Sequence, residues 1–138
     1  MAQYLLDTNI ASFIMKQTSP ELLRQVAQQP RSSLAICSVS EAELRYGMQR
    51  MPREARVWTL VPTFLSEIVI QPWDSLSAER YATVAIVQQR AGKPLSIFDT
   101  MIAAHALAHS LTLVTNDQAF QQVEGLSLED WTKGPQRA

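Results

Sequence analysis

The sequence contains a single cysteine and almost no excess of charge of either sign. Cys37 has no partner for an internal disulfide, which fits a protein that folds in a reducing compartment. Its neighbours at 34–36 are apolar, so we expect a buried packing residue rather than a nucleophile. The net charge of -1 at pH 7 and the pI of about 6.1 argue against a domain that grips nucleic acid through a broad basic face.

Long apolar runs are also absent. No stretch approaches the roughly 20 apolar residues that are needed to cross a bilayer. The first seven residues lack the basic start and the apolar core of a secretory signal. We therefore expect a cytoplasmic protein without membrane attachment.

The chain has enough apolar residues to build one folded domain. It contains 138 residues, of which 46% are hydrophobic and 18% are charged, and these proportions are typical of a globular domain. The polar residues 134–138 are expected to form a short C-terminal tail. The domain is therefore predicted to span residues 1–133.

Short apolar runs alternate with longer stretches of helical periodicity. The runs predict strands at 4–6, 34–37, 68–70 and 112–114, with a weaker fifth strand near Leu126. Helices are predicted to begin near Thr8, at Pro20, after a cap at Ser38 or Ser40, at Glu54, after a cap at Ser77, and at Phe98. Strands separated by helices indicate parallel pairing with right-handed crossovers. The sequence thus predicts an α/β domain of three layers, with a central, mostly parallel sheet of four to five strands flanked by helices.

Two acidic residues follow predicted strands. Asp7 comes directly after the first strand, and Asp117 comes shortly after the strand at 112–114. Because parallel strands end at the same edge of a sheet, both carboxylates are expected at that edge. Open α/β sheets bind their ligands in the crevice beyond this edge.

Further acids lie on two predicted helices. Glu41 and Glu43 are two residues apart, so a helix turns only one of them into the crevice. We favour Glu43, although spacing alone does not decide between them. Asp99 starts a helix whose neighbours on the same face are apolar, and a carboxylate in such a place is costly to bury without a partner.

Carboxylates that are gathered at one place repel one another and need a counter-charge. A divalent cation provides it, and oxygen ligands suit Mg²⁺ or Mn²⁺. Such a site is able to activate water and to stabilise the leaving oxygen in phosphodiester hydrolysis. The polar neighbours of the acids are candidates for holding water or supporting the carboxylates: Thr8, Asn9, Ser38, Thr115 and Asn116.

Four segments stand out in order along nearly the whole chain. They are residues 6–10 (LDTNI), 38–47 (SVSEAELRYG), 98–106 (FDTMIAAHA) and 113–120 (LVTNDQAF). Together they resemble the motifs of PIN-domain ribonucleases, and especially of the VapC-type toxins of bacterial toxin–antitoxin pairs. The second segment favours Glu43 over Glu41. One departure is that Ser96 and Ile97 stand where many relatives have Gly-Pro.

The resemblance implies a Rossmann-like fold and Mg²⁺- or Mn²⁺-dependent endoribonuclease activity on structured RNA such as tRNA. It also implies inhibition by a cognate antitoxin, and a homodimer that assembles further with this antitoxin. Carried over position by position, the resemblance makes Asp7, Glu43, Asp99 and Asp117 the catalytic and metal-binding residues. In such toxins the position of Asp117 varies between Asp and Asn.

Several other side chains have both a functional and a structural interpretation. The basic residues that are candidates for guiding RNA phosphates, or else for a solvated surface, are Arg45, Arg50, Arg90 and Lys93. His105 and His109 are four residues apart on one helix, but packing or surface positions are favoured over a metal site. The residues expected in the core or on a dimer face are Trp58, Phe64 and Leu65.

Two rival functions stay open on the pattern alone. A phosphatase or phosphotransfer domain would use Asp7 as its nucleophile. Asn9, however, stands where a haloacid-dehalogenase-like site would have a second Asp, and residues 115–117 lack the lysine of a receiver-like site. A binding module without catalysis would have little need of intact acids. Dinucleotide binding is disfavoured because no Gly-x-Gly-x-x-Gly follows the first strand.

Overall fold

Five parallel strands form the centre of the computed structural model, which describes residues 1–133. The strands are β1 (Tyr4–Leu6), β2 (Leu34–Cys37), β3 (Val69–Gln71), β4 (Thr112–Val114) and β5 (Leu128–Glu129). Their order in the sheet is β3-β2-β1-β4-β5, so the first strand of the chain lies in the middle. Tyr4 pairs with Leu34 on one side and with Thr112 on the other. The predicted parallel sheet of four to five strands is confirmed.

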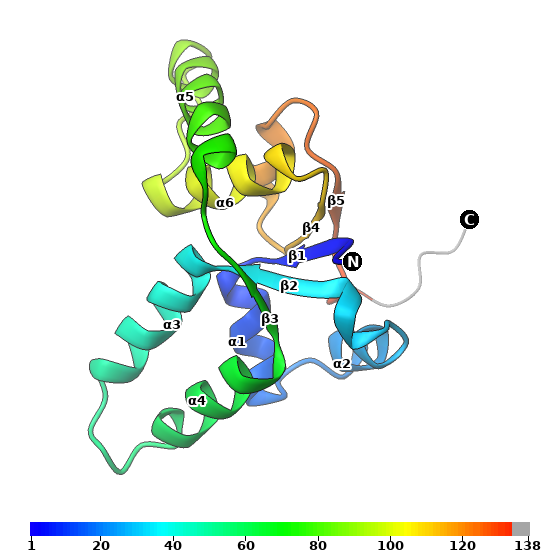
Figure 1. Cartoon of the computed structure of the whole chain (residues 1–138), viewed down its shortest axis with the longest axis vertical. Helices are drawn as coiled ribbons and strands as arrows, with labels where there is room; N and C mark the ends of the chain where they lie inside the picture. The colour runs from blue at the N-terminus through cyan, green and yellow to red at the C-terminus, as the bar shows by residue number, and fades with distance from the viewer. Residues whose placement is uncertain (134–138) are drawn as a thin grey trace.

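Six helices cover the two faces of this sheet (Figure 1). They are α1 (Thr8–Lys16), α2 (Pro20–Ala27), α3 (Ser38–Gln49), α4 (Val57–Glu67), α5 (Ser75–Arg90) and α6 (Ile97–Ala108). Helices α1 to α4 lie on one face, and α5 and α6 pack against each other on the opposite face. Two short 3-10 helices, η1 (Arg31–Ser33) and η2 (Gln118–Gln122), complete the fold. The predicted three-layer arrangement is therefore also confirmed.

The alternation of side chains along β1 separates two apolar cores. Leu6 belongs to the core beneath α1 to α4, whereas Leu5 belongs to the core beneath α5 and α6, and both side chains are fully buried. Successive residues of a strand point to opposite faces of the sheet. Burial on both faces explains why the strands read as continuous apolar runs rather than as alternating patterns.

Several helix starts differ from the sequence predictions. Helix α3 has Cys37 at its N-cap without a side-chain cap bond, so neither Ser38 nor Ser40 caps it. Asp74, not Ser77, caps α5, and α4 begins at Val57 rather than at Glu54. For α3 and α5, the reason is that the hydroxyls of the candidate serines are engaged elsewhere. Ser38 and Ser40 bond residues that are distant in the sequence, and Ser77 bonds the capping residue itself, and local sequence does not reveal these bonds.

Helix α3 also continues past Gly47 as far as Gln49. The predicted tail at 134–138 lies outside the described residues. Within residues 1–133, no helix combines the length and the apolar character needed to cross a membrane.

Candidate active site

Asp7 lies where β1 ends and α1 begins. Its Oδ1 accepts a hydrogen bond from the backbone N–H of Ile10, at 2.8 Å, and thereby caps α1. Its Oδ2 accepts a hydrogen bond from the hydroxyl of Thr115, which follows β4. Only 4% of Asp7 is exposed. One oxygen is therefore oriented by the first turn of α1 and the other by the residue that follows β4.

The environment of Asp7 disfavours its negative charge. Burial raises the pKa of Asp7 from the ordinary value of 3.8 to about 6, although the hydrogen bonds from Thr115 and Ile10 act in the opposite direction. Repulsion by the carboxylates of Asp99 and Asp117 raises this pKa further. These three acids, which are far apart in the sequence, therefore lie within electrostatic range of one another.

Asp99 and Asp117 reach the site from α6 and from the end of β4. Asp99 is half-buried in the first turn of α6, where its backbone N–H donates to Ser96 Oγ at 3.1 Å. Burial and the charge of Asp117 raise the pKa of Asp99, and a side-chain hydrogen bond with Ser96 partly offsets this rise. Asp117 is exposed, and its Oδ1 accepts a bond from the backbone N–H of Ala119 at 2.9 Å.

Glu43 is connected to the other acids through Thr8. The hydroxyl of Thr8, the residue next to Asp7, donates to Glu43 Oε1 at 2.6 Å and lies 2.9 Å from Ser40 Oγ. Glu41 instead forms an ion pair with Arg45, at 2.9 Å, on an exposed part of α3. In the structure Glu43 is thus linked to the residue beside Asp7, whereas Glu41 is paired with Arg45.

The remaining polar candidates differ in where they lie. Asn9 is exposed and lines a hollow of about 290 Å³ together with Thr8 and Glu43. Asn116 is exposed and lines a second hollow, of about 180 Å³, beside Asp117. Ser38 is engaged elsewhere, because its hydroxyl accepts a hydrogen bond from the backbone N–H of Trp73 at 3.0 Å.

Ser40 was missed by the sequence prediction, although it lies beside Thr8 in the structure. The signal that points to it is its spacing, because Ser40 precedes Glu43 by three residues and the two share a face of α3.

The donors around Asp7 suit a hard divalent cation. Carboxylate and hydroxyl oxygens are the ligands that Mg²⁺ prefers. A cation would offset the burial and the repulsion that raise the pKa of Asp7 and Asp99. Within residues 1–133, however, no three His, Cys, Asp or Glu side chains converge tightly enough to complete a metal site by themselves. Water and substrate oxygens would have to supply the rest of the coordination shell.

Comparison with known proteins identifies the family. The PIN-domain model matches residues 4–126, a span that includes all four acids. The tRNA(fMet)-specific endonuclease VapC of Shigella flexneri is 33% identical, over 96% of this chain and all of the relative. Ribonuclease VapC2 of Haemophilus influenzae is 30% identical over 95% of this chain and 99% of the relative. This chain belongs to the VapC ribonucleases of the PIN-domain family.

Solved VapBC structures share the fold over nearly the whole length. The DNA-bound VapBC of Salmonella typhimurium aligns with a TM-score of 0.87 at 30% identity, over 95% of this chain and 99% of that one. VapBC2 of Rickettsia felis, bound to a DNA fragment from its promoter, aligns with a TM-score of 0.82 at 28% identity, over 93% and 98%. PIN nucleases generally depend on divalent metal ions, which agrees with the oxygen donors around Asp7.

The basic candidates of this VapC-type chain fall into different situations. The guanidinium of Arg45 is held by Glu41. The guanidinium of Arg50 lies over the ring of Tyr46, 5.7 Å from its centre, and no carboxylate of residues 1–133 pairs with it. Arg90 and Lys93 are exposed around the C-terminal end of α5. Of these four, Arg50 directly follows the helix that carries Glu43 and has its charge free for an anion.

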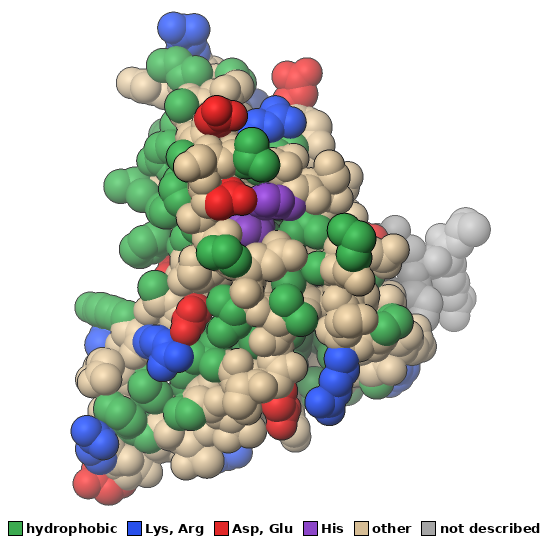
Figure 2. All heavy atoms as spheres, viewed as in Figure 1, with side chains coloured by type: hydrophobic (Ala, Val, Ile, Leu, Met, Phe, Trp, Pro, Cys, Tyr) green, Lys and Arg blue, Asp and Glu red, His purple; other side chains and the backbone are tan. Residues whose placement is uncertain are grey.

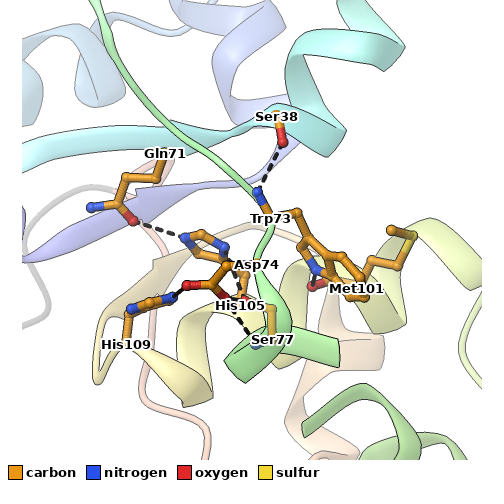
Figure 3. Close-up of polar contacts among 8 residues, drawn as sticks. All are labelled: Ser38, Gln71, Trp73, Asp74, Ser77, Met101, His105 and His109. Carbon is orange, nitrogen blue, oxygen red and sulfur yellow. Dashed lines mark hydrogen bonds and ion pairs between the residues drawn. The ribbon is translucent and has the colours of Figure 1, made fainter. Parts of the chain in front are cut away.

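The two histidines belong to a polar network between α6 and the start of α5 (Figure 3). His105 is fully buried, and its Nε2 lies 2.8 Å from Gln71 Oε1 at the end of β3. His109 Nε2 lies 2.9 Å from Asp74 Oδ2. Burial lowers the pKa of His105 to about 4, so this ring stays neutral near pH 7. This environment supports a packing role for His105, as the sequence analysis favoured.

Proposed function

We propose that this chain is the toxin of a toxin–antitoxin pair and that it cleaves RNA with Mg²⁺ or Mn²⁺ at a site formed by Asp7, Glu43, Asp99 and Asp117. The observation that carries the assignment of the site is the buried carboxylate of Asp7, whose pKa is raised to about 6 beside two further acids. A fold gains no stability from such an arrangement, whereas a cation-dependent site requires it.

Each side chain has a task that follows from its contacts. Ile10 and Thr115 hold the carboxylate of Asp7 in one orientation. Thr8 orients Glu43 toward the same crevice. Asp99 and Asp117 add oxygen donors for one or two cations, and water and substrate oxygens supply the rest of the coordination shell. A divalent cation in this place supplies positive charge that offsets the carboxylates, activates water and stabilises the leaving oxygen of a phosphodiester.

The substrate and the partners are inferred from named relatives. The Shigella relative is a tRNA(fMet)-specific endonuclease, so tRNA is the RNA that we propose for this chain. Several solved relatives are VapBC complexes, and an antitoxin that inhibits the enzyme is therefore proposed as its partner. A homodimer that assembles further with the antitoxin, and a cytoplasmic location where tRNA is abundant, complete the proposal.

Cleavage of a total tRNA pool by antitoxin-free protein tests the nuclease. The reaction is run with Mg²⁺, with Mn²⁺ and with EDTA, for the wild type and for Asp7→Asn. Asp74→Asn is the matched control, because Asp74 also caps a helix but lies in the histidine network. We expect discrete fragments that require both the metal and Asp7, and normal cleavage by Asp74→Asn.

Two outcomes would contradict the proposal. Full cleavage by Asp7→Asn would show that Asp7 is not part of the catalytic site. Intact metal binding without cleavage of any RNA would favour a phosphotransfer or partner-binding role instead.

A further inference from the structure

An open groove lies beside the acid site. It has a volume of about 540 Å³ and is lined by Ala42, Glu43, Tyr46 and Gly47 of α3, by Arg50 just after α3, and by Phe98 of α6. Glu43 thus forms part of the groove wall, and Phe98 directly precedes Asp99. Hydrophobic side chains stand out along the edge of the molecule where α3 and α6 approach each other (Figure 2). The groove is therefore a direct extension of the place where we expect the scissile phosphate.

Two aromatic rings on this groove are unusually exposed. Tyr46 is 59% exposed and Phe98 is 51% exposed, so neither ring contributes a full share to the core. Gly47 also lines the groove, and a Cβ at this position would meet no atom within 4 Å. Glycine weakens a helix interior relative to alanine, and the packing of this fold does not require it at this position.

The same groove carries a positive charge. Arg50 lies against the ring of Tyr46, and within residues 1–133 no carboxylate pairs with its guanidinium. A protein partner that covered the groove would have to bury this charge, at a cost, or supply an acid for it. A nucleotide satisfies both features at once, since its base has an apolar face and its phosphate accepts hydrogen bonds from arginine.

We propose that the groove binds one unpaired RNA nucleotide adjacent to the bond that is cut. Its base stacks on Phe98 and Tyr46, and Arg50 contacts its phosphate. Stacking on aromatic side chains is how single-stranded RNA bases are commonly held, and it tolerates different bases because every base has a π face. The inference rests on the proposed function and adds a positioning site to it.

Fluorescence of 2-aminopurine tests the stacking. The probe is a single-stranded RNA hexamer with one 2-aminopurine, added with Mg²⁺ to an Asp7→Asn parent so that it is not cut. Tyr46→Ala and Phe98→Ala are compared with Tyr46→Phe and Phe98→Tyr, which keep a ring. Ile97→Ala is the matched control, because Ile97 is 68% exposed next to Phe98 and does not line the groove.

We expect quenching by the parent, by the ring-keeping variants and by Ile97→Ala. Each alanine variant at Tyr46 or Phe98 should lose quenching and raise the Kd roughly 5- to 150-fold, the range that corresponds to the loss of one stacked base. In wild-type cleavage assays, the same substitutions should raise KM more than they lower kcat.

The salt dependence of binding tests Arg50 separately. Arg50→Gln should lower the slope of log Kd against log salt by about 0.7, the value for one phosphate contact on a single strand. Arg24→Gln, an exposed arginine on α2, should leave the slope unchanged.

Three results would overturn the inference. The first is no quenching by the parent. The second is unchanged quenching and affinity in both alanine variants. The third is that the alanine variants dissociate from dimer to monomer in sedimentation while each protomer binds RNA as before. The last result would make the groove a contact between two copies of the chain.

Failure of the nuclease and failure of the groove have different signatures. Cleavage that depends on Asp7 but not on the two rings would leave the nuclease and remove the groove. Ring-dependent quenching without any cleavage would support the nucleotide-binding groove and contradict the nuclease.

Discussion

Asp7 and Asp74 both cap α-helices in this fold, and their electrostatic situations are opposite. Asp7 caps α1 and Asp74 caps α5, and each accepts a hydrogen bond from the backbone N–H three residues further on. The pKa of Asp7 is raised to about 6, whereas the pKa of Asp74 is lowered to about 2. The local motif is the same, so the difference comes from what surrounds each carboxylate.

The surroundings of Asp74 compensate its charge, and those of Asp7 do not. Asp74 receives bonds from the backbone and the hydroxyl of Ser77, and His109 lies beside it. Asp7 is buried and faces the carboxylates of Asp99 and Asp117. A polar cluster that is satisfied by the protein stabilises the fold, whereas a cluster of like charges indicates a place for a ligand.

The largest effect is expected for Asp99→Asn. A bound cation supplies several kcal/mol of transition-state stabilisation, so loss of this ligand should lower kcat/KM by about 1,000-fold. Thermal unfolding should show no loss of stability, because the substitution removes a repulsive charge. Asp130→Asn is the control at the same sheet edge, since Asp130 bonds Thr132, and it should cleave normally. Near-normal activity of Asp99→Asn would show that Asp99 is not a ligand.

His105→Ala should affect stability rather than activity. The substitution leaves a cavity and removes the partner of Gln71, so the free energy of unfolding should fall by about 2–4 kcal/mol. Urea denaturation measures the loss, and kcat well below the melting temperature should stay within about twofold. His109→Ala, at a partly exposed position, should have a smaller effect. A large fall in kcat with unchanged stability would place His105 in the acid site instead.

Asp7→Asn should stabilise the metal-free fold above pH 6. The Asp7 carboxyl ionises near 3.8 when unfolded and near 6 when folded, so the wild type loses stability as pH rises from about 4 to 6 and keeps this penalty above pH 6. Two pKa units correspond to about 3 kcal/mol, an upper bound on the gain.

The gain in Asp7→Asn should vanish near pH 4, where the wild-type carboxyl is protonated. It should also shrink when Mg²⁺ is added, because the cation stabilises only the wild type. Melting temperatures at pH 4 and pH 7.5, with EDTA or Mg²⁺, measure both effects. A variant less stable than the wild type at pH 7.5 in EDTA would contradict the repulsion described above.

The smallest effect is expected for Thr8→Val. The loss of the hydroxyl frees Glu43, and removal of such a supporting bond typically weakens metal affinity or activity by about 10- to 100-fold. Thr8→Ser keeps the hydroxyl and should restore most of the activity. Equal activity of the two variants, measured as kcat/KM over a range of Mg²⁺ concentrations, would mean that Thr8 does not position Glu43.

Most of the sheet and half of the acid site follow from local sequence. Continuous apolar runs predicted four of the strands, because strands that are buried on both faces have no polar positions. The parallel arrangement then placed Asp7 and Asp117 at one edge. Helix starts were less predictable, since a serine that bonds a distant residue has the same local sequence as a serine that caps a helix. Ser38, which bonds Trp73, is the example.

The choice of Glu43 needed more than the residues themselves. Helix spacing separates Glu41 from Glu43 but does not say which one faces the crevice, and the family resemblance supplied that information. The groove between Tyr46 and Phe98 had no local signature at all, because its walls come from helices about 50 residues apart. Contacts of this range depend on how α3 and α6 pack on the sheet.

The central position of β1 has a consequence for protein synthesis. Asp7 leaves the ribosome well before its partner Thr115, which follows 108 residues later. Strand β4, whose carboxyl end leads to Thr115 and Asp117, is made after α1 to α6. Because synthesis proceeds from the N-terminus, an unfinished chain holds Asp7 without Thr115 or Asp117. A ribosome that makes this enzyme is therefore not exposed to its activity before β4 and the residues that follow it have been made.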